Sequence, residues 1–158
     1  MNFKTVKSRQ FQHIGANGRS TDTFLPVFDH PGWPAAKNLK ELGSNIFVIG
    51  NTLGHLNQSA FFREVLKIYQ GTPPEINLFN EKSNGLIVQK LISKKLLNSV
   101  HDISSGGILV ALTEMCISGK IGAEIKVTQN KLNLHEYLFG EDQSRYLIEV
   151  NEKNKNEV

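Results

Sequence analysis

Residues 100–119 read Val-His-Asp-Ile-Ser-Ser-Gly-Gly-Ile-Leu-Val-Ala-Leu-Thr-Glu-Met-Cys-Ile-Ser-Gly, and this stretch decides the fold class. Its first four residues are typical of a short strand. Two serines and two glycines follow them. Apolar residues then recur at helical spacing: Ile108, Leu109, Leu112, Met115 and Cys116. The stretch therefore predicts a strand that leads through a glycine turn into a helix ending at Ser118-Gly119.

The segments before this stretch predict a strand and two helices. Ile46–Ile49 is a β-branched and aromatic run ended by Gly50, which is typical of a buried strand. A polar loop, 50–58, follows it. Ser59 can cap a helix that ends at Gly71, and Asn80 can cap a second helix with apolar residues at helical spacing up to Leu96.

The segments after it predict two further strands. Ala123, Ile125 and Val127 alternate with charged residues, as in a strand with one wet face. Residues 133–139 predict a short helix or turn, and 145–150 a last strand with Tyr146, Ile148 and Val150 on one face.

Alternating strands and helices predict an α/β (α+β) class, a layered domain with helices packed on a mixed sheet. The domain is expected over residues 33–150. Residues 1–32 predict an irregular or extended segment. Its aromatic residues Phe24 and Phe28, with Trp33, are expected either to tuck onto the domain edge or to contact a partner. Residues 151–158 predict a polar tail that frays.

The composition excludes several classes of protein. The 158 residues carry 18 Lys+Arg and 15 Asp+Glu, a net charge of +3. The cations are scattered, so we expect no nucleic-acid partner. No apolar run is long enough to span a membrane, and one cysteine, Cys116, excludes a disulfide framework. Met1–Lys4 lacks an apolar signal core, so a cytoplasmic location is expected.

The candidate ligand site is the turn Ser104, Ser105, Gly106 and Gly107. At a helix N-terminus, free backbone N–H groups and the helix dipole favour an anion, and glycines let it approach closely. The turn therefore predicts a phosphate-binding site. The same residues also fit an ordinary serine N-cap with a tight turn.

The loop after the first strand is a second candidate. Thr52, Asn57 and Ser59 are expected to face a ligand beyond the end of the strand. The loop has neither a Walker ending nor a dinucleotide-binding glycine pattern.

Other polar groups predict no catalytic or metal site. His101 and Asp102 could be half of a hydrolytic triad, but adjacent strand residues point to opposite faces. We therefore expect an exposed histidine beside a buried aspartate, and these two residues are expected to support the turn. Glu141-Asp142 fits a paired-carboxylate site or a polar loop entering a strand. The histidines are not paired at metal-ligand spacing, and Cys116 is expected in the core.

Several motifs in order closely resemble the phosphoribosylformylglycinamidine synthase family, in its last domain, the C-terminal type of the AIR-synthase-related superfamily. They are Gly50–Ser59, Pro73–Leu78, Asn84-Gly85, His101–Gly107, Ala111–Met115 and Leu138–Tyr146. The family turn reads His-Asp-x-Ser-Asp-Gly-Gly, and Ser105 stands here in place of its second aspartate.

The resemblance implies a role in purine biosynthesis. The family converts formylglycinamide ribonucleotide to formylglycinamidine ribonucleotide with ATP, Mg²⁺ and ammonia from glutamine. Its amino-terminal type of domain carries most of the ATP and Mg²⁺ chemistry, so we expect neither to bind this chain strongly. The remaining synthase domains and the glutamine amidotransferase component are the implied partners.

Two functions stay open. The first is a single domain or fragment of the synthase, not catalytic alone. The alternative is a non-catalytic module that binds a phosphorylated small molecule or nucleotide, or that pairs with another subunit.

Overall fold

The computed structural model describes residues 2–6, 38–126 and 132–158, and within them a five-stranded sheet in the order β3-β5-β2-β1-β4. The strands are β1 (Asn2–Val6), β2 (Asn45–Ile49), β3 (Ser99–Ile103), β4 (Gly122–Lys126) and β5 (Arg145–Val150). Every strand pair of the described sheet is antiparallel, where a mixed sheet was expected. β1, which the sequence analysis did not place, lies between β2 and β4.

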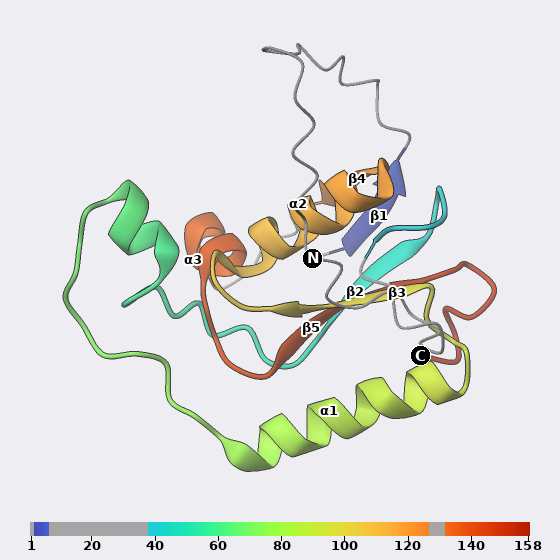
Figure 1. Ribbon diagram of the computed structural model, residues 1–158, viewed down its shortest axis with the longest axis horizontal. Helices are drawn as coiled ribbons and strands as arrows, with labels where there is room; N and C mark the ends of the chain where they lie inside the picture. The colour runs from blue at the N-terminus through green and yellow to red at the C-terminus, as the bar shows by residue number, and fades with distance from the viewer. Residues whose placement is uncertain (1, 7–37, 127–131) are drawn as a thin grey trace, which may run out of the picture.

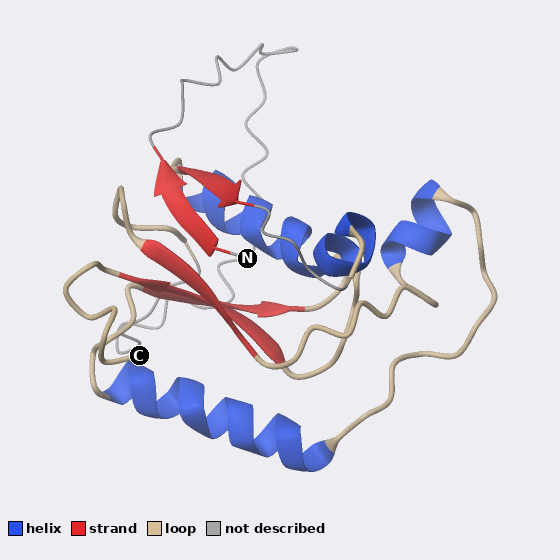
Figure 2. Cartoon of the chain, turned by 180° about the vertical axis from the view of Figure 1, so that it is seen from behind, coloured by secondary structure: helices blue, strands red, loops and turns tan. Residues whose placement is uncertain are grey.

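Helices cover both faces of the sheet, which confirms the layered α+β class. α2 (Gly107–Gly119) and α3 (Leu134–Phe139) lie on one face, and α1 (Leu78–Ser93) lies along the other (Figures 1 and 2). On β5, Leu147 packs under α2, whereas Ile148 and Val150 pack in the cluster that includes Leu91 of α1. The period of two that the sequence predicts for this strand is therefore confirmed.

The helix predicted from Ser59 to Gly71 is wrong beyond its first turn. Only a short π-helix, η1 (Phe61–Val65), forms, although Ser59 Oγ does accept the Phe62 N–H. The side chains of Val65, Leu66 and Tyr69 are 63%, 47% and 64% exposed. Because short helices depend on packing of an apolar face, the described residues give this segment no support for further turns.

The ends of the other helices follow their caps. α1 begins three residues earlier than expected because Asn77, not Asn80, is its N-cap and accepts the Asn80 N–H. α2 spans the predicted residues, and α3 has a capping box between Asn133 and Glu136.

The C-terminal end of the predicted domain lies within the described residues, whereas its expected start does not. The aromatic residues Phe24, Phe28 and Trp33, the start of the domain at 33, and Val127 lie outside the described residues. The C-terminal tail was expected to fray, but it forms turns, in which Asn154 bonds Asn151 Oδ1 and the Leu96 carbonyl. These contacts hold the tail against the end of the helix layer.

Candidate functional site

The turn between β3 and α2 has the geometry that its glycines require. Gly106 and Gly107 have φ values of 85° and 69°, a region that side chains other than glycine rarely adopt. The Gly107 N–H donates to the Ser104 carbonyl at 3.1 Å. Ser104 and Ser105 are exposed and both glycines are buried. The turn thus presents two hydroxyl-bearing residues to solvent and keeps its glycines inside.

The Gly106 N–H, the donor expected to face an anion, is bonded within the chain. It donates to Oε1 of Glu141 at 2.7 Å, and the Ala60 N–H donates to the same oxygen at 2.7 Å. A single carboxylate oxygen therefore joins the start of α2 to the start of η1.

The next residue, Asp142, holds the loop that follows β2. Its Oδ2 accepts the N–H groups of Leu53 and Gly54, each at 2.9 Å, and its Oδ1 accepts the His55 N–H at 3.1 Å. Of the two interpretations of Glu141-Asp142, the structure favours the polar loop, since both carboxylates bind backbone N–H groups.

Arg145 lies beneath these acids and is 1% exposed. It donates to the carbonyls of Asp142 and Gly140 and to Thr52 Oγ1, and its Nη1 lies 3.7 Å from Asp142 Oδ2. Burial lowers the pKa of the guanidinium, and the charge of Asp142 opposes that shift. Thr52, expected to face a ligand, therefore belongs to this buried network.

A cavity of about 360 Å³ lies above this network. It brings together three of the predicted site residues, Asn57, Ser104 and Ser105. The rest of its lining is Gln58, Arg63, Pro73, Pro74, Ile103, Glu141, Asp142 and Gln143. Ser59 is not part of it, because its side chain is 0% exposed and caps η1.

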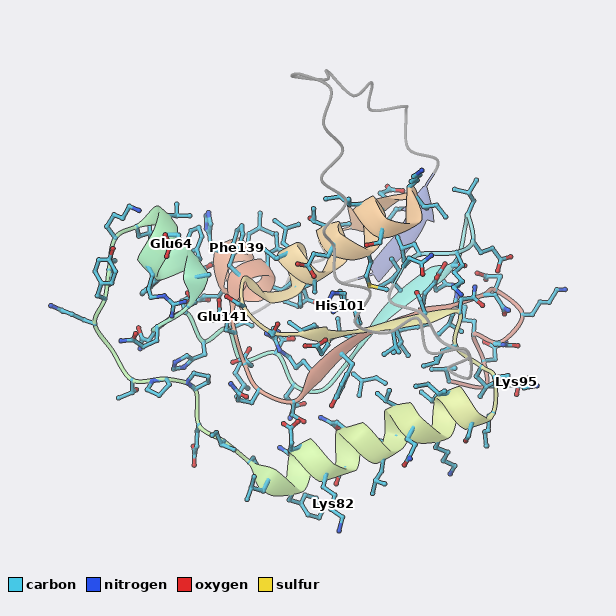
Figure 3. All side chains as sticks on the ribbon, in the orientation of Figure 1. Glu64, Lys82, Lys95, His101, Phe139 and Glu141 are labelled. Carbon is cyan, nitrogen blue, oxygen red and sulfur yellow. The ribbon has the colours of Figure 1, made fainter. Side chains whose placement is uncertain are left out.

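Arg63 is the charged cavity residue that was not predicted from the sequence. It is the single cation among the lining residues, and its Nη1 donates to the Gln58 carbonyl. The available signal was its position four residues after Ser59, which places it on the same side of a helical turn as the cap. Figure 3 shows that η1, where Glu64 is labelled, and the segment carrying Glu141 lie on the same side of the molecule.

The arrangement expected for His101 and Asp102 is reversed. The His101 side chain is 9% exposed and Asp102 is 69% exposed. His101 points to the face covered by α2, where its Nε2 lies 2.8 Å from Glu114 Oε2. Asp102 is paired in register with Tyr146 and is exposed, and its Oδ1 lies 3.4 Å from Nδ1 of His101. Neither residue lines the cavity.

The described residues offer no metal site. None of their His, Cys, Asp and Glu side chains form a group of three that could hold a metal ion. Cys116 packs against the main core, as expected, and burial raises the pKa of its thiol. None of the described helices is long and apolar enough to cross a membrane.

The chain is similar to one described protein family and to several known proteins. The model of the family described as AIR synthase related protein, C-terminal domain, matches residues 41–158. Phosphoribosylformylglycinamidine synthase subunit PurL of Pelagibacter ubique is 56% identical over 113 residues, which are 72% of this chain and 16% of that protein. The subunit of the same name from Nitrobacter hamburgensis is 43% identical over 119 residues, 75% and 16% of the two chains. The chain thus spans about 16% of the length of these relatives.

Two solved structures share the fold. Thermotoga maritima PurL complexed with FGAR has a TM-score of 0.64 and 18% identity, covering 78% of this chain and 22% of that one. The same protein complexed with ATP has a TM-score of 0.56 and 19% identity, covering 78% and 20%. This likeness supports the layered architecture.

Proposed function

Because the chain belongs to the AIR synthase related protein family, as its C-terminal domain, we propose that it acts as one domain of a phosphoribosylformylglycinamidine synthase and binds a phosphorylated ribose compound in the cavity beside α2. Support comes from the relatives at 56% and 43% identity that bear this name. The activity, ATP and FGAR would then belong to the assembled synthase, together with its amidotransferase component.

The combination of Arg63 with Ser104 and Ser105 in one cavity carries the ligand proposal. A guanidinium forms strong charge-assisted hydrogen bonds with phosphate oxygens, and serine hydroxyls donate to the same oxygens. The bond from Arg63 to the Gln58 carbonyl orients that guanidinium before a ligand arrives. The phosphate therefore lies at the Arg63 side, between η1 and the exposed serines.

This domain would position the ligand and leave the chemistry to other domains. Phosphoryl transfer needs a preorganised set of charges around the transferred group. Here Asp142 and Glu141, the acids of the cavity, bind backbone N–H groups of the loop and the turn. Among the described residues, no three His, Cys, Asp or Glu side chains gather as metal ligands. In this proposal Mg²⁺ would act in the other domains of the synthase.

Replacing Arg63 tests the proposed function. In calorimetric titration with ribose 5-phosphate, Arg63→Gln should bind at least about tenfold more weakly than the wild type, because a hydrogen bond to a charged group contributes about 1.5–3 kcal/mol. Lys82→Gln, on the exposed side of α1, changes the net charge equally and should bind as the wild type does. Equal affinity of Arg63→Gln and wild type, or no binding by the folded wild type, would refute the cavity as the ligand site.

A second candidate function, pairing with another synthase domain, rests on an exposed apolar surface. This surface, the 65–87 face, consists of Val65, Leu66, Ile68, Tyr69, Ile76, Leu78, Phe79, Leu86 and Ile87, each at least 40% exposed. Its residues follow one another from η1 through the long loop into α1, which Figure 1 shows at the edge of the molecule. Exposed large apolar residues in this number along one segment are typical of interaction surfaces.

The 65–87 face predicts self-association of the isolated chain. Sedimentation velocity should show oligomers of the wild type that grow with concentration, because the described residues leave this face exposed. The double variant Leu78→Ser/Phe79→Ser, at positions 76% and 78% exposed, should shift the distribution towards monomer. Ile117→Ser, 70% exposed on α2, is the matched control and should leave it unchanged. A wild type that stays monomeric at all concentrations would count against this face.

A further inference from the structure

Glu141 joins two helix starts through one oxygen atom. Its Oε1 lies 2.7 Å from the backbone nitrogens of both Gly106, the N-cap of α2, and Ala60, which precedes η1. Figure 3 shows the residue on the segment after α3, beside η1. Glu141 also lines the cavity. It is therefore both a structural link and a part of the cavity wall.

The carboxylate occupies the place that a bound anion would take. The N-terminus of a 13-residue helix such as α2 favours negative charge, and a phosphate oxygen there would accept the Gly106 N–H. Glu141 already accepts that N–H. A phosphate at the same point would meet a like charge within a few ångströms, and partial burial strengthens that repulsion.

We propose that Glu141 determines the specificity of the cavity by acting as an internal anion at the start of α2. It excludes phosphate from the Gly106 N–H and confines the ligand's phosphate to the side of Arg63. Its own carboxylate accepts hydrogen bonds from hydroxyl groups of the ligand. The cavity then favours phosphorylated polyols, such as sugar phosphates, over inorganic phosphate. This ligand preference rests on the proposed function, whereas the exclusion of phosphate from Gly106 does not.

The amide resonance of Gly106 provides a direct test. We would titrate inorganic phosphate into the full chain and follow this resonance by NMR for the wild type, Glu141→Gln and Glu141→Ala. The wild-type resonance should not respond at millimolar phosphate. Glu141→Ala frees the N–H and removes the charge, so the resonance should shift, with phosphate affinity at least about tenfold higher. Glu141→Gln retains an acceptor oxygen, so it should fold like the wild type and gain less.

Glu64→Gln is the matched control, since it removes one exposed negative charge from η1 without changing the cavity lining. It should behave as the wild type does. Two results would overturn the inference: a Gly106 response to phosphate in the wild type equal to that of Glu141→Ala, or no response in either folded Glu141 variant. Failure of ribose 5-phosphate to bind the wild type would refute the proposed function and leave the phosphate exclusion by Glu141 standing.

Discussion

Arg145→Met should lower the free energy of unfolding by about 3–5 kcal/mol, the cost of removing one partner from a buried ion pair. The guanidinium is 1% exposed and donates to the Asp142 and Gly140 carbonyls and to Thr52. Methionine fills similar volume but donates no hydrogen bond. The variant therefore leaves two carbonyls without this donor and Asp142 without its cation.

Urea denaturation followed by circular dichroism measures this loss. Arg63→Met is the matched control: Arg63 is only partly buried, so its replacement should cost less than about 1 kcal/mol. Arg145→Lys retains the charge but cannot reproduce the fork of donors, and it should fall between the wild type and Arg145→Met. If Arg145→Met were as stable as Arg63→Met, the buried network would not hold the site together.

The elements that the sequence predicts well are those with a strong local pattern. α2 has apolar residues at helical spacing and glycine at both ends, and β5 alternates with a period of two. The 59–71 segment also has apolar residues at helical spacing, but a helix there depends on packing against another element. Because Val65 and Tyr69 remain exposed, the local pattern alone does not specify the helix.

The candidate site depends on contacts between residues far apart in sequence. Gly106 and Glu141 are 35 positions apart, and Asp142 and Leu53 are 89 apart. Local spacing predicts a turn whose backbone N–H groups favour an anion. It does not reveal that the carboxylate of Glu141 is the anion that the Gly106 N–H binds. The same limit explains the reversal of His101 and Asp102, because strand alternation separates the two faces without identifying the face that α2 covers.

The other large effect is expected at Gly107. Gly107→Ala should lower the free energy of unfolding by about 2–5 kcal/mol, the sum of a left-handed backbone on a non-glycine residue and overpacking. The φ value is +69°, and an added Cβ would lie 2.7 Å from the carbonyl oxygens of both Gly140 and Leu138. These are backbone atoms at the end of α3, so the clash is relieved only if α3 moves away from α2.

Gly85→Ala in α1 is the control, because the nearest atom to its added Cβ, Tyr146 Oη, is 3.9 Å away. Alanine should stabilise this helix by about 0.4–1 kcal/mol. Urea denaturation without ligand distinguishes two roles for Gly107. If the glycine serves only the close approach of an anion, Gly107→Ala should unfold as the wild type does and lose ligand affinity alone. If it serves the contact between α2 and α3, stability should fall with no ligand present, and the structure predicts this second result.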